Sequence, residues 1–191
     1  NGTIQMERDA RPNRQAIKAR YSSSEESGEM TERKGYLSLK ADHFIRPHQY
    51  VYAMEELKYD QFKDLDLSTA TGAGYGVEVW KDKRKSLDVE LGGAYLHERY
   101  EDAADESRLA PRTAAKVGYN MTRRVELKNA LVAFPSLDGG DYEYYNEATV
   151  HFKMDQHWGF NVVNIYEFDS DPADSNKKTD ATTSMGVRYS F

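Results

Sequence analysis

The sequence has no cysteine and no run of apolar residues long enough to cross a bilayer as a helix. The first absence excludes disulfide bridges, thiolate metal sites and a cysteine nucleophile, and the second excludes a helical membrane protein. A basic excess is also lacking, since the net charge is −6 and the pI about 5.4, which argues against a nucleic-acid binder. Aromatic residues are abundant instead, with 14 Tyr, 7 Phe and 2 Trp. This composition indicates a folded, β-rich chain.

Apolar and polar residues alternate with a period of two almost from end to end, most clearly in residues 142–155 and 181–191. This period is that of half-buried β-strands, so we predict an all-β, antiparallel, up-and-down fold. The predicted strands lie near residues 2–8, 13–22, 31–45, 49–60, 66–81, 85–100, 108–121, 124–136, 142–155, 157–169 and 179–191. Many exceed the common globular length of about five or six residues and suit the roughly 9–11 residues of a tilted transmembrane strand.

Two kinds of connection alternate along the chain. Short basic ones, such as residues 81–85 and 122–124, alternate with longer acidic ones at 22–29, 101–107 and 169–178. In an up-and-down meander every second connection lies at the same end of the sheet. Bacterial outer-membrane barrels are built in this way, with short periplasmic turns and longer outer loops.

The same alternation suits a soluble barrel or a sandwich whose apolar face points inward. Two features favour the membrane barrel: charges of both signs crowd the polar face, and tyrosines stand near strand ends on the apolar face, where a bilayer has its headgroups. In a membrane barrel the charged side chains face inward. The predicted lumen-lining residues are Glu78, Asp88, Glu90, Glu98, Arg112, Lys116, Glu126, Lys128, Glu147, His151, Lys153 and Arg188.

The C-terminal residues 184–191, which include Gly186, Tyr189 and Phe191, resemble the signal by which the outer-membrane assembly machinery recognises its substrates. Further segments, in this order and approximate spacing, carry a family resemblance: LSTATGAGYG (67–76), LDVELG (87–92), YLHERY (95–100), DSDP (169–172) and KTD (178–180). Over about residues 30–191 the chain is similar to the salt-induced outer membrane protein family of Gram-negative bacteria, a family of unknown function. The resemblance implies an outer-membrane location, a cleaved signal peptide on the precursor and a β-barrel. From composition and pattern we expect a single barrel domain over residues 1–191. It supplies no catalytic residue.

Single-chain bacterial barrels prefer an even number of strands. Because eleven are visible, we expect about twelve, with the first strand before Asn1. Asn1-Gly2 is a strong hairpin signal and is expected to form the turn that joins it.

Few residues suggest chemistry. His97 and His151 stand near acids, but no serine, histidine and orienting group can be assembled from the sequence, so we expect a hydrogen-bonded rim histidine at position 97 and no enzyme. The candidate calcium ligands Asp169, Asp171 and Asp174 alternate in one loop, although Asp-Pro and Asp-Ser also simply shape turns. We expect no cofactor.

The sequence therefore predicts an outer-membrane β-barrel that is either a narrow passive channel or an osmotic or envelope-stress protein. The alternative is a non-conducting barrel that anchors an envelope or surface assembly, and a lipid-modifying hydrolase comes third. Paired charges, such as Glu90 with Arg112 or Glu126 with Lys116, either fill the interior or line a narrow pore. The expected partners are outer-membrane lipid and lipopolysaccharide, the assembly machinery during insertion and an envelope protein, with no nucleic acid.

Overall fold

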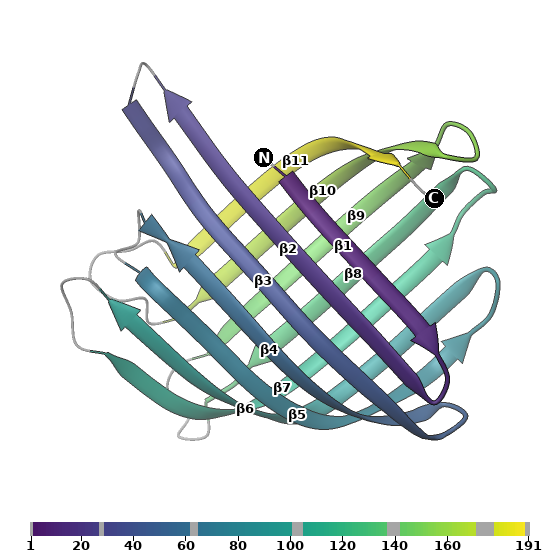
Figure 1. The fold of residues 1–191 in the computed structure, drawn as a ribbon, viewed down its shortest axis with the longest axis horizontal. Helices are drawn as coiled ribbons and strands as arrows, with labels where there is room; N and C mark the ends of the chain where they lie inside the picture. The colour runs from purple at the N-terminus through teal and green to yellow at the C-terminus, as the bar shows by residue number, and fades with distance from the viewer. Residues whose placement is uncertain are drawn as a thin grey trace. The chain divides into compact units, whose positions relative to one another are not determined.

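Among the residues that the structure describes, eleven strands follow one another as neighbours in one sheet, in the order β1 to β11 (Figure 1). The computed structural model describes residues 2–26, 29–61, 65–100, 105–136, 142–170 and 178–189. Its strands are β1 (Gly2–Ala10), β2 (Asn13–Glu26), β3 (Glu29–Arg46), β4 (Gln49–Asp60), β5 (Leu65–Lys81), β6 (Lys85–Tyr100), β7 (Glu106–Asn120), β8 (Val125–Phe134), β9 (Glu143–Lys153), β10 (Trp158–Asp169) and β11 (Thr179–Tyr189). The predicted all-β, antiparallel, up-and-down fold is confirmed. In the described part of the chain, no helix is long and apolar enough to cross a membrane.

Two strands run further than the sequence predicts. Residues 22–29 were expected to form a long acidic loop, yet β2 continues to Glu26 and β3 starts at Glu29. Ser22 pairs with Lys34 and Ser24 with Glu32, and the register shifts between Ser24 and Glu25. The expectation was wrong because backbone pairing extends a hairpin without apolar side chains, whereas the sequence pattern detects only alternation.

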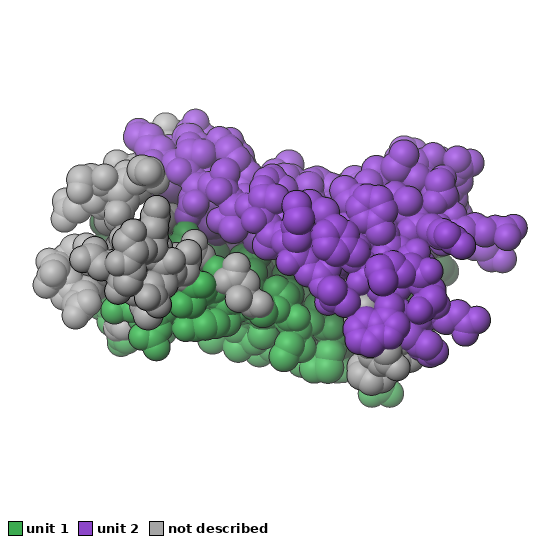
Figure 2. All heavy atoms as spheres, turned by 90° about the horizontal axis from the view of Figure 1, so that it is seen from above, with its two compact units in different colours: residues 1–75, 92–111 green, residues 76–91, 112–191 purple. Residues whose placement is uncertain are grey.

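The chain divides into two compact units, coloured separately in Figure 2. Unit 1 comprises residues 1–75 and 92–111, and unit 2 comprises residues 76–91 and 112–191. In each unit, one face of the sheet carries buried side chains and the other carries exposed ones. Along β4 in unit 1, Tyr50, Tyr52 and Met54 are buried while Val51 is exposed. We call these two surfaces the buried face and the exposed face.

Glycines on the buried face make room for the large side chains of β4. The sequence places Gly72, Gly74 and Gly76 on one face of β5, where a bulky group can approach the backbone. In unit 1, a Cβ on Gly72 would lie 3.4 Å from Met54, and one on Gly92 in β6 would lie 2.5 Å from the Tyr52 hydroxyl. The glycines of β5 and β6 therefore leave the space that the side chains of Tyr52 and Met54 occupy.

Candidate functional site

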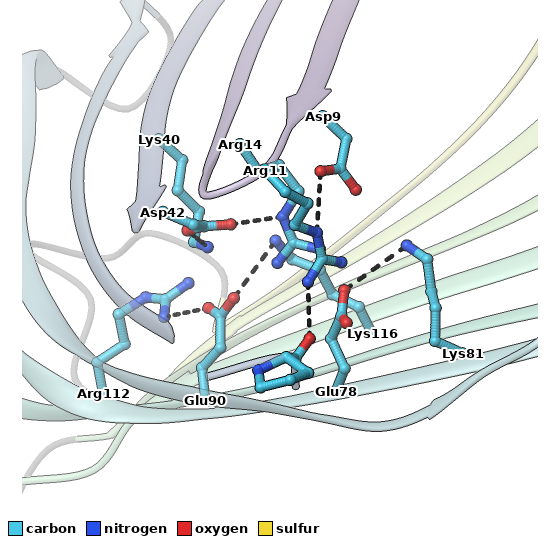
Figure 3. Close-up of polar contacts among 11 residues, drawn as sticks. Asp9, Arg11, Arg14, Lys40, Asp42, Glu78, Lys81, Glu90, Arg112 and Lys116 are labelled. Atoms are coloured by element: carbon cyan, nitrogen blue, oxygen red, sulfur yellow. Dashed lines mark hydrogen bonds and ion pairs between the residues drawn. The ribbon is translucent and has the colours of Figure 1, made fainter. Parts of the chain in front are cut away.

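The most deeply buried charges of unit 2 lie on neighbouring strands. Arg112 on β7 donates through Nη1 to Glu90 Oε2 on β6 at 2.9 Å, and each residue is 2% exposed (Figure 3). Lys116, further along β7, brings its Nζ to 3.7 Å from Glu90 Oε1. Charges this deeply buried are maintained only when they are paired, because desolvating an isolated ion costs several kcal/mol. The predicted pairing of Glu90 with Arg112 is confirmed.

The second predicted pair is wrong. Lys116 approaches Glu90 instead of Glu126, and Glu126 lies 3.3 Å from Lys128 on its own strand. Strand register decides such partners, and the sequence does not give it. Glu78, at the end of β5, lies 3.7 Å from Lys81.

His151 on β9 is buried and makes a side-chain hydrogen bond with Asn161 on β10. A Cβ on Gly159 would lie 2.5 Å from His151 Cε1, so a glycine is required beside the imidazole. Glu147, on the same strand, accepts a hydrogen bond from the Tyr145 hydroxyl at 2.6 Å. These two hydrogen-bonded pairs lie on the buried face of unit 2.

Unit 1 has its own charged cluster, which sequence reasoning missed. Arg14 Nε on β2 donates to Asp42 Oδ2 on β3 at 2.6 Å, and Lys40 also bonds to Asp42 (Figure 3). Both cations lie over aromatic rings, Arg14 at 4.8 Å and Lys40 at 5.0 Å from the centre of Tyr50. The alternation along each strand could have indicated this cluster. Arg14 lies an odd number of positions from the exposed Ile17, and Lys40 and Asp42 lie an odd number from the exposed Leu39. Side chains at such spacings point to opposite faces of a strand.

Arg11 continues this cluster at the β1–β2 turn. Its guanidinium carbon lies 3.5 Å from the centre of the Phe44 ring, its Nε donates to Asp9 at 3.2 Å, and its Nη1 donates to the carbonyl of Pro47 at 2.8 Å. Two turns of unit 1 are thus tied together through one side chain.

The remaining predicted residues differ in burial. Asp88 is buried, Glu98 is half-buried and accepts from Ser68 Oγ at 3.2 Å, and Lys153 is exposed at the end of β9. Of the predicted assembly signal, Gly186 is exposed, and a Cβ added there would have nothing within 4 Å. The side chains of Arg188 and Tyr189, and the whole of Phe191, lie outside the described residues. Lumen lining and assembly recognition stay predictions for all of them.

His97 lies on the exposed face of β6 and its Nδ1 is 2.8 Å from Ser107 Oγ on β7. The expected hydrogen-bonded histidine is therefore present, and its partner Ser107 was missed because it lies ten residues away, beyond an acidic connection. A nucleophilic site also needs a group that orients the imidazole. Within the described ranges, no such group contacts His97.

No group of three or more His, Asp or Glu residues in the described part of the chain is placed to hold a metal ion. Asp169 lies at the end of β10, where its backbone N–H donates to Lys178 O at 2.9 Å. The other two candidate calcium ligands, Asp171 and Asp174, lie outside the described residues.

The exposed face of unit 2 carries two groups of neighbouring aromatic rings on β9 and β10, one stacked and one tilted. Tyr144 stacks on Phe168 at 5.1 Å and on Tyr166 at 5.6 Å. Toward the other end of the same strands, Phe152 lies 6.4 Å from Phe160. Between these groups the exposed face carries small and apolar side chains, among them Ala148, Val150 and Val162.

Three pairs of polar side chains on the exposed face are joined by hydrogen bonds in the described part of the chain. Asn129 and Asn146 share hydrogen bonds of 3.2 Å across β8 and β9, and Asn164 donates to Thr183 at 2.9 Å across β10 and β11. In unit 1, Thr71 donates to Glu55 at 2.6 Å. Polar groups on a surface that excludes water need hydrogen-bond partners on that same surface.

A family model described as "Protein of unknown function, DUF481" matches residues 1–191. The chain belongs to this family. The part of the sequence resemblance that pointed to a family of unknown function is thus confirmed, while the salt-induced character stays a prediction. No curated protein matches the sequence.

Three solved structures resemble this member of the DUF481 family. The NanC porin aligns with a TM-score of 0.57 and 5% identity over 100% of this chain and 98% of the porin. The CymD monoaromatic hydrocarbon channel (0.42, 10% identity, 99% and 73%) and a porin refined at 1.8 Å resolution (0.46, 10% identity, 99% and 61%) align less well. At such low identity, the likeness to the NanC porin shows that the chain has the fold of that porin.

Proposed function

We propose that this protein is a single β-barrel of the bacterial outer membrane that passes small polar solutes. The observation that carries the proposal is the polarity of the sheet: ion pairs such as Glu90 with Arg112 are buried, while Met185 and Val187 are 70% exposed. A soluble β-protein has the opposite arrangement, with apolar side chains inside. The porin-like fold is consistent with this proposal.

The size of the exposed apolar area supports a lipid environment. More than twenty large hydrophobic side chains are exposed among the described residues. Burying such a side chain completely contributes about 1.5–3 kcal/mol, so even partial burial of twenty contributes on the order of 20 kcal/mol. Leaving this face in water would forgo that hydrophobic contribution. Acyl chains provide the cover that this face needs.

The aromatic groups on β9 and β10 support the same placement. Tyr144 and Phe152 are eight positions apart, which corresponds to about 26 Å along a strand at roughly 3.3 Å per residue and to roughly 20 Å along the membrane normal for a strand tilted by about 35–45°. A transmembrane barrel presents an apolar band about 25 Å tall between two aromatic girdles. The polar residues within this band, including Asn129 and Asn146, are bonded to each other, as a lipid-facing surface requires.

A second function is favoured by one specific observation. Arg112, Tyr50 and Glu90 are the largest fully buried side chains among the described residues, and water barely reaches them. A barrel filled by such groups conducts nothing and would anchor an envelope or surface assembly instead. No catalytic role enters either proposal, because His97 has Ser107 as partner but no orienting group among the described residues.

Planar-bilayer recordings of the refolded full chain separate the two functions. Discrete current steps are expected for a channel, and silent insertion is expected for a filled barrel. Insertion is checked independently by protease protection of the reconstituted protein. A protein that stays in the aqueous phase would contradict both functions, because both require a lipid-facing sheet.

Cell fractionation tests the location, for which we infer a precursor with a cleaved signal peptide. The expected partners are lipid, lipopolysaccharide and the outer-membrane assembly machinery. Recovery in the outer-membrane fraction is expected, and recovery in the soluble fraction would contradict the proposal.

A further inference from the structure

Basic residues concentrate in the tight turns of unit 2, at the short-turn end of its strands. The segment Lys81-Asp82-Lys83-Arg84-Lys85 spans the β5–β6 turn, and the β7–β8 connection contributes Arg123 and Arg124. Lys83, Arg84, Lys85, Arg123 and Arg124 are all exposed. We call these five residues the basic rim. They take no part in the buried ion pairs described above, which lie further along the strands.

Backbone hydrogen bonds join the two turns to the neighbouring hairpins. The backbone N–H of Asn120 donates to the carbonyl of Arg84 at 2.7 Å, and its side chain donates to the carbonyl of Lys83 at 2.9 Å. Lys153 N donates to the carbonyl of Arg124 at 2.7 Å. The turns therefore stand beside one another along the edge of unit 2, so their charges act together.

The one acid of the first turn faces the backbone. Asp82 Oδ1 accepts hydrogen bonds from the N–H groups of Arg84 at 2.7 Å and Lys85 at 2.8 Å. This arrangement closes the turn, while the basic side chains stay exposed and the Lys85 ammonium lies 4.8 Å from the centre of the Trp80 ring. Residues 81–85 carry a net charge of +3 and residues 121–124 a net charge of +2. The whole chain has a net charge of −6, so this excess is local.

The basic rim lies next to aromatic side chains at the margin of the exposed face. Arg84 Nη2 donates to the Tyr119 hydroxyl at 3.1 Å, and its guanidinium lies 5.5 Å from the centre of that ring. Met121, Met154 and Trp158 are exposed at the same strand ends. Long cationic side chains beside aromatic rings at the margin of an apolar surface match the headgroup zone of a bilayer, where the stem contacts apolar groups and the charge meets phosphate.

We propose that the basic rim binds the phosphate-bearing headgroups of anionic phospholipids in the leaflet next to the short turns. The inference rests on the proposed function, since it requires the exposed face to lie in lipid. An acidic protein would match the charge equally well. Lipid is favoured because the rim continues directly into exposed apolar side chains, which a purely electrostatic protein contact does not need.

The two tryptophans of the chain, Trp80 and Trp158, both lie at this end of unit 2, so indole fluorescence reports the lipid beside the rim. The test uses the full chain with Trp80→Phe, which leaves Trp158 as the single indole, in vesicles of phosphatidylcholine mixed with phosphatidylglycerol. Brominated phosphatidylglycerol and brominated phosphatidylcholine are introduced separately as quenchers. Their ratio of quenching gives the local preference for the anionic lipid.

We expect stronger quenching by the anionic lipid, and we expect Arg84→Gln/Arg123→Gln/Arg124→Gln to bring the ratio toward one. A basic group near an anionic surface is worth about a fivefold change in affinity, so removing three gives a measurable loss. The matched control, Arg33→Gln/Arg99→Gln/Arg108→Gln, removes the same number of arginines near the acidic connections at the other ends of the strands and is expected to keep the preference.

Each outcome is decisive. Equal quenching by both lipids in the parent protein, or an unchanged ratio in the triple variant, would overturn the proposal while leaving the membrane barrel intact. An equal loss in the control would also overturn it, because the preference would then follow total charge. Quenching of Trp158 by neither lipid in a protein that protease protection shows to be inserted would overturn the rim proposal alone. If protease protection shows no insertion either, the proposed function itself fails.

Discussion

A side chain at Gly92 in unit 1 would meet rigid backbone atoms. A Cβ there would lie 2.3 Å from the carbonyl oxygen of Ala73 and 2.8 Å from the Cα of Gly74, both backbone atoms. We expect Gly92→Ala to destabilise the fold by about 1–3 kcal/mol or more, as overpacking does. Urea unfolding in detergent micelles measures the effect.

The neighbouring glycine provides a control for this prediction. The nearest atom to a Cβ on Gly93 is the Ala110 carbonyl oxygen at 3.9 Å, which is ordinary contact. Gly93→Ala is therefore expected to unfold at the same urea concentration as the parent. Equal midpoints for the two alanine variants would contradict the packing described for β5 and β6.

The buried pair of Glu90 and Arg112 leads to a second residue-scale prediction. Glu90→Gln leaves the Arg112 charge almost fully buried without its carboxylate, which costs about 3–5 kcal/mol. Glu90→Leu/Arg112→Met removes both charges and is expected to be more stable than the single variant. Equilibrium unfolding of the two proteins provides the comparison.

Glu126→Gln is the matched control, because its partner Lys128 has a side chain that is 52% exposed. An ion pair with this much exposure to water contributes about 0–1 kcal/mol. We therefore expect the free energy of unfolding of this variant to be close to that of the parent. If Glu126→Gln loses as much stability as Glu90→Gln, the cost of breaking an ion pair does not depend on its burial.

At the scale of the element, the tight turns give the sheet a defined dependence on pH. Backbone N–H groups of Lys85 and Arg84 hold the pKa of Asp82 below its ordinary value of 3.8, and those of Trp158 and His157 do the same to the pKa of Asp155. A carboxylate with a lowered folded pKa stabilises the folded state above the unfolded pKa. That contribution is lost as the pH falls through the folded pKa.

We therefore expect the unfolding midpoint to fall when the pH is lowered from about 5 to about 2, and to fall less in Asp82→Asn/Asp155→Asn. Asparagine keeps an acceptor for the turn N–H groups but does not titrate in this range. Urea titrations at several pH values measure the difference. An identical pH dependence in both proteins would show that other carboxylates are responsible.

The sequence predicted the strands better than it predicted the contacts between their side chains. The period of two reflects which face of a strand is apolar, so every strand from β1 to β11 could be located. Strand ends were less predictable: β8 begins at Val125 and ends at Phe134, inside the predicted range, because side-chain alternation continues after backbone pairing stops.

The charged sites could be predicted only in part. Glu90 and Arg112 lie on consecutive strands with opposite charges, so their pairing was accessible. The cluster of unit 1 joins Arg14 to Asp42, 28 residues away, and adds a ring from a third strand. Such a group depends on cross-strand register, which composition and period do not contain.

At the scale of the whole molecule, removing bulk from the buried face distinguishes a narrow channel from a filled barrel. Glu90→Ala/Arg112→Ala deletes two of the largest fully buried side chains of the described residues together with both of their charges. If these groups narrow a conducting path, single-channel current steps in planar bilayers should become larger than those of the parent. Met185→Ala/Val187→Ala trims two exposed side chains and should leave the steps unchanged. Larger current steps in both variants would indicate a nonspecific leak. If no inserted protein, parent or variant, gives current steps, the filled barrel is the function, because the conductance of a pore lined by Glu90 and Arg112 must change when these side chains are removed.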